Sequence, residues 1–350
     1  MENDLDIKKL LFDYSKKTTP LLRRYLESKT SDAKKIGAIN VEMLQKFLKL
    51  VEKGKKVRGL LVVLGYQIAG GKDLEAIYEA STFMEIMHCG GLIHDDIMDN
   101  DDYRRGVPTI HKQFEKYGRH NGESLAIMAG DMALYLSWDK LLNSNFSAEA
   151  LIAAGKIYSR YALNTVYGQT LDALNNQDSK ADQSSILNIF RYKTAEYTGV
   201  LPLLVGAALS GVSDRKKIKK LSEYGLALGW AFQIQDDLLG LFGSAEKTGK
   251  PVGSDLREGK MTILIHYILK NGNKQQKEYL VKILGNKNLE QKDIEEAQDF
   301  FKKAGAYQYV LDLGWDYVAR GKAAIPFFTK DENLKLTLGS LISFVMNRIA

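Results

Sequence analysis

Apolar residues recur at three- and four-residue intervals over most of the chain, and this spacing predicts helices. Alternating strand patterns with tight turns are scarce, and only 5 prolines interrupt the 350 residues. Residues 74–99 and 221–242 are apolar on nearly every side, which predicts helices buried inside a bundle. Since no low-complexity linker divides the chain, we expect one all-helical domain over residues 1–350. Short polar breaks are expected near residues 27–37, 175–185, 211–217, 271–276 and 285–291.

The first candidate site is the stretch HCGGLIHDDIMDN at 88–100, where acidic residues end an apolar helix. Asp95 and Asp99 are four residues apart and share a helix face, with Asp96 beside them. Carboxylates packed this closely in apolar surroundings repel one another unless a cation or protons intervene. Hard cations such as Mg²⁺ bind one or two carboxylates together with substrate phosphates. The pattern predicts such a site, with a solvated acidic helix end as the alternative; His94 is interpreted as a structural or hydrogen-bonding residue.

A second acidic pair repeats this chemistry in QIQDDLLG at 233–240. Gln233, Asp236, Asp237 and Gly240 fall on one helical stripe, and aromatic and aliphatic residues fill the other faces. Two buried helices that each carry paired aspartates could face a common cavity and hold several Mg²⁺ ions. Such an arrangement suits a substrate with two phosphates.

Basic residues flank both acidic helices, and their side chains suit phosphate oxygens. Arginine binds phosphate through two parallel hydrogen bonds, whereas lysine acts as a point charge. A basic residue by itself is more often a surface charge, and these residues indicate phosphate binding only because they flank both acidic helices. They are Lys55 and Arg58 in GKKVRG, Arg104 and Arg105 after the first acidic pair, Lys193 before Thr194, and Lys250 and Lys260 after the second pair.

Composition narrows the possible partners and compartment. The net charge of +6 permits an anionic partner, but no zinc spacing or nucleic-acid motif accompanies it, and we expect no nucleic-acid binding. The run DRKKIKK at 214–220 is interpreted as a solvated loop between helices. The single cysteine, Cys89, excludes an internal disulfide and favours the cytoplasm. The longest apolar run, 199–212, is too short to cross a bilayer, which leaves at most peripheral membrane contact.

Six ordered motifs together resemble the trans-type polyprenyl diphosphate synthases, most closely the archaeal-style geranylgeranyl enzymes. They are GKKVR, HCGGLIHDDIMD, YRRG, GQTLD, KTAEYTG and FQIQDD with GKPVGSD and GK. The resemblance implies an antiparallel helix bundle around a deep central cavity, a homodimer, and a Mg²⁺-dependent prenyltransferase. The implied reaction joins an allylic diphosphate to isopentenyl diphosphate, and up to three Mg²⁺ ions stabilise the leaving diphosphate.

The resemblance also implies roles for particular residues. The metal ligands would be Asp95, Asp96, Asp99, Asp236 and Asp237. Isopentenyl diphosphate would bind Lys55, Arg58, His88 and Arg105, and the allylic diphosphate would bind Arg104, Lys193, Lys250 and Lys260. Lys193, Thr194 and Gln233 resemble catalytic groups near the allylic cation, and Gln169 and Asp172 would line the site, orient Lys193 or only tie helices together. Gly240 departs from the family's DDxxD motif and places the third metal ion in doubt.

Gly90 and Gly91 together weaken their helix by about 2 kcal/mol. In the family, bulky residues at these positions form a floor that stops chain growth, so glycines imply a product longer than farnesyl diphosphate. Met87, Met84 and Phe83 are the next candidates for that floor, at twenty carbons or beyond. The alternative is that the two glycines permit close helix packing.

Two other functions stay open. A noncatalytic partner subunit of a prenyl synthase would tend to lose acids from one motif, yet both pairs are present here. A class I terpene cyclase shares the first acidic motif but usually carries a different metal motif in place of QIQDD.

Overall fold

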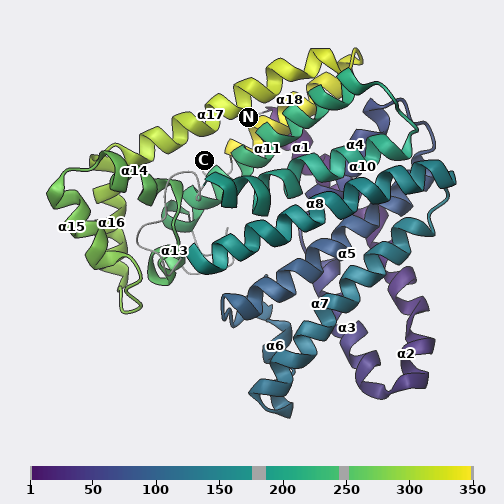
Figure 1. Cartoon of the computed structure of the whole chain (residues 1–350), viewed down its shortest axis with the longest axis horizontal. Coiled ribbons are helices and arrows are strands. Elements are labelled where there is room, and N and C mark those ends of the chain that lie inside the picture. Colours follow the sequence, from purple (N-terminus) through teal and green to yellow (C-terminus); the bar gives the residue numbers. More distant parts are fainter. Residues whose placement is uncertain (1, 176–186, 244–251, 348–350) are drawn as a thin grey trace. The chain divides into compact units, whose positions relative to one another are not determined.

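The structure is a computed structural model that describes residues 2–175, 187–243 and 252–347. The described residues are almost all helical, with one short antiparallel hairpin, so the all-α expectation is confirmed (Figure 1). Contacts group the chain into two compact units, Met1–Ile157 with Pro202–Ser213, and Tyr158–Leu201 with Asp214–Ala350. We describe each unit by itself, and the single domain over 1–350 stays a prediction.

The first unit is a set of helices joined by short turns, with the hairpin between two of them. Its elements are α1 (Glu2–Ser28), α2 (Thr30–Ile36), α3 (Ala38–Glu52), α4 (Val57–Ile68), α5 (Leu74–Met98), β1 (Tyr103–Arg104), β2 (Val107–Pro108), α6 (Ile110–Gln113), the 3₁₀ turn η1 (Glu115–Tyr117), α7 (Arg119–Leu142), the start of α8 (Ala148–Asn175), and α10 (Leu201–Leu209).

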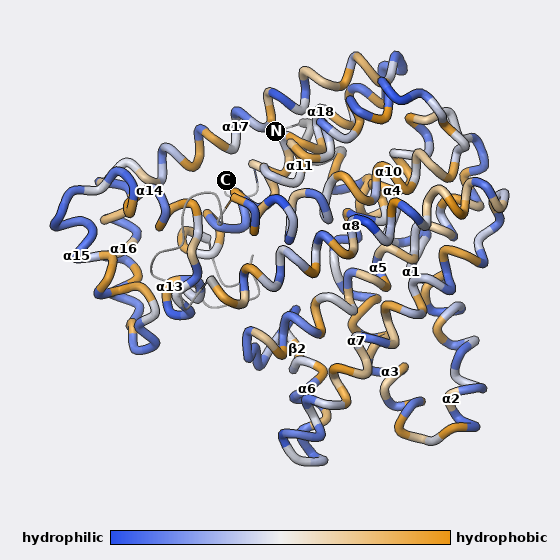
Figure 2. Tube along the Cα trace, viewed as in Figure 1, coloured by the Kyte–Doolittle hydropathy of each residue, from blue (hydrophilic) through white to orange (hydrophobic). Residues whose placement is uncertain are grey.

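Helix α5 confirms the buried helix expected over 74–99. It begins after Asp73, whose carboxylate accepts a hydrogen bond from the backbone N–H of Ala76 at 3.0 Å, as an N-cap does. It packs against α1, α3, α4, α6 and α7. Alanines of α7 are buried beside it in a cluster that includes Phe47, Ile86 and Phe114. Figure 2 shows α4 and α10 hydrophobic along most of their length, as helices enclosed by neighbours should be.

The second unit is built around one long helix, α11 (Arg215–Phe242). Its other elements are the rest of α8, the π-helix η2 (Phe190–Val200), α13 (Ser254–Glu258), α14 (Ile263–Asn271), α15 (Lys274–Ile283), α16 (Gln291–Lys303), α17 (Ala306–Ala324), the 3₁₀ turn η3 (Ile325–Phe327) and α18 (Glu332–Met346).

Helix α11 packs against η2, α17 and α18, and the ring of Trp230 stacks on Tyr317 with 5.2 Å between centroids. The buried helix expected over 221–242 is confirmed, but the loop expected over 214–220 is wrong. The Asp214 carboxylate accepts hydrogen bonds from the backbone N–H groups of Lys216 and Lys217 at 2.9 and 3.1 Å, so the basic run forms the first turns of α11.

Candidate active site

The first acidic motif occupies the last turn of α5. The backbone N–H of Asp99 donates to the carbonyl of Asp95 at 2.8 Å, which places these two residues one turn apart. Both are partly exposed. Asn100 then takes a left-handed φ of 53°, and the helix ends. The expected sharing of one helix face by Asp95 and Asp99 is confirmed by this geometry.

Asp96 is held differently from its two neighbours. Its side chain is 1% exposed and accepts a hydrogen bond from Nε of Arg104, which also lies 3.3 Å from Asp101. Burial raises the pKa of Asp96 to about 6, although the Arg104 guanidinium opposes that shift. Asp96 therefore anchors Arg104, and its role as a supporting metal ligand stays a prediction.

His94 lies between α5 and α7, where its Nε2 is 3.2 Å from the carbonyl of Ile127 and 3.5 Å from Asp131. The interpretation of His94 as a hydrogen-bonding residue is confirmed.

Two of the predicted diphosphate-binding residues, Arg58 of α4 and His88 of α5, come together between these helices. Nη1 of Arg58 is 3.2 Å from Nε2 of His88. Burial lowers the pKa of His88 well below its usual value, and the charges of Arg58, Arg105 and Arg104 act in the same direction. His88 is therefore neutral at pH 7, and the charges of three guanidinium groups act on it.

Arg105 occupies the turn of the β1–β2 hairpin, which the hydrophobic pattern did not predict. Arg105 and Gly106 have φ values of 54° and 74°, as the primed turns of two-residue hairpins require. Nη1 of Arg105 donates to the carbonyl of Leu50 at 3.1 Å and to that of Lys53. The guanidinium thus caps the end of α3, directly before the loop that carries the exposed Lys55.

The second acidic motif lies on α11, in the other unit. Asp237 is 5% exposed, and its carboxylate accepts hydrogen bonds from Gln233 at 2.7 Å and from the backbone N–H of Ile263 at 3.2 Å. Burial raises the pKa of Asp237 to about 8, and the charges of Asp255 and Asp236 add to the shift. Gln233 therefore holds Asp237, and the partly exposed Asp236 is the better placed of the two acids to meet a substrate.

The place of the missing acid at Gly240 is filled from another segment. A Cβ built on Gly240 would overlap Oδ2 of Asp255, which belongs to α13. A side chain at 240 would therefore require the Asp255 carboxylate to move, because that carboxylate already stands there.

Lys193 and Thr194 lie in η2, a π-helical stretch of the kind often found at functional sites. Nζ of Lys193 pairs with Asp172 of α8 at 2.5 Å, a contact that fits both the orientation of Lys193 and a simple tie between α8 and η2. Lys260 pairs with Glu258 at 3.0 Å. Gln169 is partly buried on α8, and Lys250 lies outside the described residues.

The two glycines of α5 have different surroundings. A Cβ built on Gly90 would lie 2.9 Å from Cβ of Ala133 and 3.0 Å from the carbonyl of Gly130, so α5 and α7 meet there. A Cβ on Gly91 would meet no atom within 4 Å among the described residues beyond its own helix turn. Met84 and Met87 are buried. Close packing thus explains Gly90, while Gly91 faces open space.

The donor set at the end of α5 fits a hard divalent cation. Within the described ranges, no three His, Cys, Asp or Glu side chains converge on one metal position. Mg²⁺ commonly takes only one or two carboxylates and completes its shell with water and substrate phosphates. Asp95 and Asp99, one turn apart and partly exposed, satisfy that requirement.

Glu85 lies outside the motifs of the sequence, and Asp255 ends one of them, GKPVGSD, which by itself assigns it no role. Glu85 is a lone acid within the apolar run TFMEIM, and an acid in that setting is itself a signal. Asp255 follows the second acidic pair by many residues, and only its contact with Gly240 indicates what it does.

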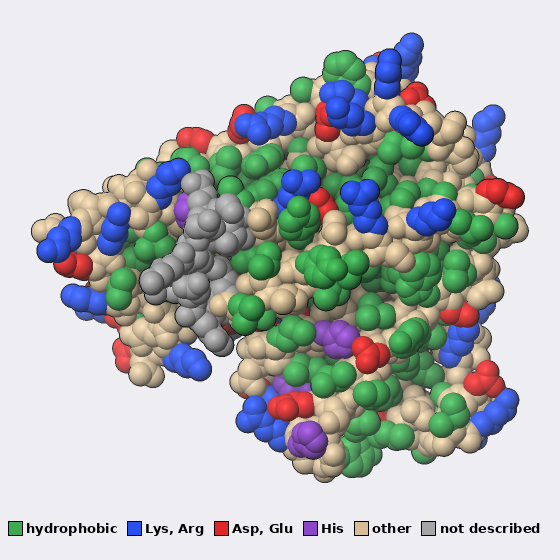
Figure 3. All heavy atoms as spheres, in the orientation of Figure 1, with side chains coloured by type: hydrophobic (Ala, Val, Ile, Leu, Met, Phe, Trp, Pro, Cys, Tyr) green, Lys and Arg blue, Asp and Glu red, His purple; other side chains and the backbone are tan. Residues whose placement is uncertain are grey.

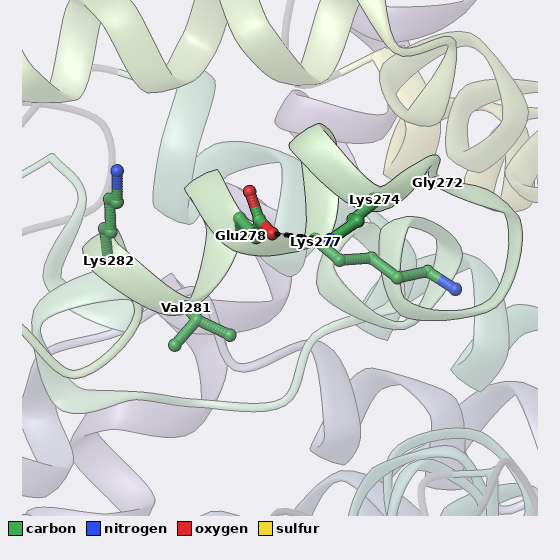
Figure 4. A pocket seen from close by; sticks show the side chains of 6 residues that line it. All are labelled: Gly272, Lys274, Lys277, Glu278, Val281 and Lys282. Carbon is green, nitrogen blue, oxygen red and sulfur yellow. Dashed lines mark ion pairs between the residues drawn. The ribbon is translucent and has the colours of Figure 1, made fainter.

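A surface pocket of about 650 Å³ on the second unit is lined by Gly272, Lys274, Lys277, Glu278, Val281 and Lys282. None of the predicted site residues lines it. Figure 4 shows the side chains of Lys277 and Lys282 pointing away from each other, and Lys274 is paired with Glu278 at 4.0 Å. The three lysines do not form a common anion-binding site.

Comparison with known proteins identifies the family. The sequence profile described as polyprenyl synthetase matches residues 40–301. The chain belongs to the polyprenyl synthetase family. The enzymatic activity expected from the motifs, a chain-elongating prenyltransferase, is thereby confirmed.

Several isoprenyl diphosphate synthases are similar to this chain in sequence over most of their length. A short chain isoprenyl diphosphate synthase of Methanocaldococcus jannaschii is 34% identical, over 85% of this chain and 86% of its own length. A geranylgeranyl diphosphate synthase of Saccharolobus solfataricus is 35% identical, over 75% and 77%. A geranylfarnesyl diphosphate synthase of Aeropyrum pernix is 32% identical, over 85% and 91%.

Among solved polyprenyl synthetase structures, the geranylgeranyl pyrophosphate synthase of Corynebacterium glutamicum superposes with a TM-score of 0.89 at 30% identity. The match covers 96% of this chain and 98% of that one, and that crystal structure holds isoprenyl diphosphate and magnesium. A polyprenyl synthase of Caulobacter crescentus, solved with calcium and isoprenyl diphosphate, has a TM-score of 0.76 at 28% identity and matches 95% of this chain and 98% of that one.

Proposed function

We propose that this polyprenyl synthetase joins isopentenyl diphosphate to an allylic diphosphate and makes geranylgeranyl diphosphate or a longer all-trans product. The observation that carries the proposal is the region around His88, where Nη1 of Arg58 lies 3.2 Å from Nε2 of His88, two turns before Asp95 on α5. Arg58, Arg104 and Arg105 contribute its charge. A diphosphate carries several negative charges, and guanidinium groups bind its oxygens through paired hydrogen bonds.

The residues around His88 would bind and orient isopentenyl diphosphate. Arg58 and Arg105 supply charge-assisted hydrogen bonds, and neutral His88 can donate one of its own. Lys55, exposed in the loop before α4, adds a point charge. Fixing the diphosphate in this way would hold the double bond at a constant distance from the allylic carbon.

The allylic diphosphate would meet Arg104, Lys193, Lys250 and Lys260. Arg104 is held in place by Asp96, and Lys193 by Asp172. Thr194 and Gln233 would lie near the allylic carbon, where their oxygens can face developing positive charge.

Divalent cations are the expected cofactor, with Asp95 and Asp99 as ligands on α5 and Asp236 with Asp237 on α11. Solved relatives hold magnesium or calcium together with isoprenyl diphosphate, which supports this assignment. When bound, Mg²⁺ neutralises the leaving diphosphate and so favours cleavage of its bond to the allylic carbon. Asp255 would supply the carboxylate that Gly240 lacks.

A product of twenty carbons or more is supported by the open space at Gly91. The relatives include enzymes named for products of twenty and of twenty-five carbons. We assign the floor of the chain-length pocket to Met87 and Met84, which are buried below Gly91 on α5.

A homodimer is supported by an apolar stripe on α7. Met128, Tyr135 and Leu142 recur every seven residues, which places them on one helix face, and all three are exposed. Figure 3 shows hydrophobic side chains exposed on the face of the molecule where α7 lies. Such a stripe is typical of a helix that packs against another chain.

Within the described part of the chain, no helix is long and apolar enough to span a bilayer.

The first experiment is a product assay. The purified chain is incubated with Mg²⁺, farnesyl diphosphate and labelled isopentenyl diphosphate, and the products are sized by chromatography against an EDTA control. A twenty-carbon product would support a floor at Met87 or Met84, whereas a longer ladder would place the floor deeper. The absence of labelled product both with and without EDTA would refute the proposal and favour a noncatalytic partner subunit.

A further inference from the structure

Glu85 is an acidic side chain buried in the middle of α5, outside every motif recognised in the sequence. It is only 4% exposed, and its neighbours Met84 and Ile86 are fully buried. A carboxylate removed from water is costly unless hydrogen bonds or cations compensate it. Its presence there therefore calls for a partner of matching chemistry.

That partner is the first turn of α4. Oε1 of Glu85 accepts a hydrogen bond from the backbone N–H of Gly59 at 2.7 Å. Gly59 is the third residue of α4, and N–H groups in the first turn have no acceptor within the helix. Lys56 stands at the N-cap, and its ammonium group can only donate. Glu85 therefore takes the place of the missing cap from a different helix, at the positive end of the α4 dipole.

Tyr14 of α1 packs against this contact. A Cβ built on Gly59 would overlap the hydroxyl of Tyr14 and lie 3.1 Å from Oε1 of Glu85. That hydroxyl is 2.8 Å from Oγ of Ser81, one turn before Glu85 on α5. Burial raises the pKa of Tyr14, and the Glu85 charge adds to the shift, so the two groups are electrostatic neighbours.

The same turn of α4 carries Arg58, whose Nη1 reaches His88 at 3.2 Å. The preceding loop is tightly held as well. Lys56 has a left-handed φ of 51°, is buried, and donates from Nζ to the carbonyl of Glu52 at 2.7 Å. Burial raises the pKa of Glu85, while the Gly59 N–H and the charges of Arg58, Lys56 and Arg105 oppose the rise. Arg58 and Arg105, two of the cations proposed to bind the diphosphate, are thus electrostatic neighbours of Glu85.

We propose that Glu85 is a positioning residue for isopentenyl diphosphate, because its carboxylate caps α4 and so fixes the turn that presents Arg58 to the substrate. This inference rests on the proposed function of the Arg58–His88 region. It assigns Glu85 no contact with substrate, and it predicts an effect on one of the two substrates only.

The length and the negative charge of the side chain at position 85 should have opposite effects on the binding of isopentenyl diphosphate, and this difference can be tested. If Glu85 acted only through its negative charge, removing that charge would strengthen the binding of an anion to the nearby arginines. If it acts by holding Gly59, shortening the side chain weakens binding although the charge is kept. Glu85→Gln keeps the length and an accepting oxygen, whereas Glu85→Asp keeps the charge and withdraws the oxygen by one methylene.

The experiment compares these two variants with the wild-type chain by calorimetric titration of isopentenyl diphosphate and by steady-state kinetics for both substrates. Glu85→Asp should raise the Kd and KM for isopentenyl diphosphate roughly tenfold, as expected for a lost helix cap. Its KM for farnesyl diphosphate should stay within about threefold of the wild-type value, since only one substrate meets Arg58. Glu85→Gln should stay within about threefold for both substrates.

Ser81→Ala is the matched control, because it removes a buried hydrogen bond to Tyr14 from the same face of α5 without touching Gly59. It should leave both KM values unchanged. Equal weakening in Glu85→Gln and Glu85→Asp, tighter binding in Glu85→Gln, or a parallel rise of both KM values in Glu85→Asp would each overturn the positioning role. A wild-type chain that neither binds nor condenses isopentenyl diphosphate would instead refute the proposed function.

Discussion

The two adjacent glycines on α5 should differ in how alanine changes the free energy of unfolding. Alanine is favoured over glycine inside a helix by about 1 kcal/mol, and this gain applies equally to Gly90 and Gly91. At Gly91 nothing opposes it, because the new Cβ meets no atom within 4 Å among the described residues beyond its own turn. Gly91→Ala should therefore stabilise the chain by about 1 kcal/mol.

At Gly90 the same methyl group would lie 2.9 Å from Cβ of Ala133 and 3.0 Å from the carbonyl of Gly130. The second contact is with backbone of α7, which cannot rotate away as a side chain can. Overpacking of this kind costs about 1–3 kcal/mol. After the helix gain of about 1 kcal/mol is subtracted, Gly90→Ala should be neutral to destabilising by about 2 kcal/mol. The difference between the two variants isolates the packing term, at about 1–3 kcal/mol.

Urea unfolding followed by circular dichroism measures this difference directly, provided that the two variants share the same denaturant slope. Because both substitutions are identical and adjacent, effects on the unfolded chain cancel. A Gly90→Ala variant as stable as Gly91→Ala would refute the close approach of α5 and α7 at Gly90.

A Gly91→Phe variant, assayed for product length, should release a shorter product than the wild-type chain, whereas an unchanged length would remove Gly91 from the chain-length pocket.

Three further outcomes are expected. Asp95→Ala and Asp236→Ala should each lower kcat by roughly a hundredfold or more with an unchanged circular dichroism spectrum, and full activity in either would remove that residue from the proposed metal site. Asp172→Asn should weaken the orientation of Lys193, now 2.5 Å away, and raise the KM for the allylic diphosphate several-fold (roughly 3- to 10-fold) while the KM for isopentenyl diphosphate stays constant. Burial raises the pKa of the Cys89 thiol to about 11, so iodoacetamide at pH 8 should label it only after denaturation; rapid labelling of the native chain would contradict its burial.

Much of the fold and part of the site followed from local patterns. The helical periodicity of 74–99 predicted α5 nearly to the residue, and that of 221–242 predicted α11 except for its first turns, because an apolar helix must be buried wherever the chain takes it. The spacing of Asp95 and Asp99 placed both on one turn for the same geometric reason. The loop prediction for the basic run at 214–220 was wrong because a run of charges predicts exposure to solvent rather than irregular structure. Asp214 caps the helix that begins at this run.

Contacts between distant segments could not be predicted in this way. The β1–β2 hairpin depends on a left-handed arginine, a conformation that side-chain type does not favour. Asp255 stands in the place of a side chain at Gly240, fifteen positions earlier in the chain, and the GKPVGSD motif that contains Asp255 does not indicate this contact.

The sequence by itself determined that this protein is helical, that two of its buried helices carry aspartate pairs, and that its motifs are those of a polyprenyl synthetase. These properties depend on residue type and spacing along one helix, which no tertiary contact alters. Only the tertiary structure decided that Gly90 packs while Gly91 faces open space, and that Glu85 caps α4. Each of these depends on which atoms of a second helix lie within a few ångströms, and that proximity is a property of packing rather than of local pattern.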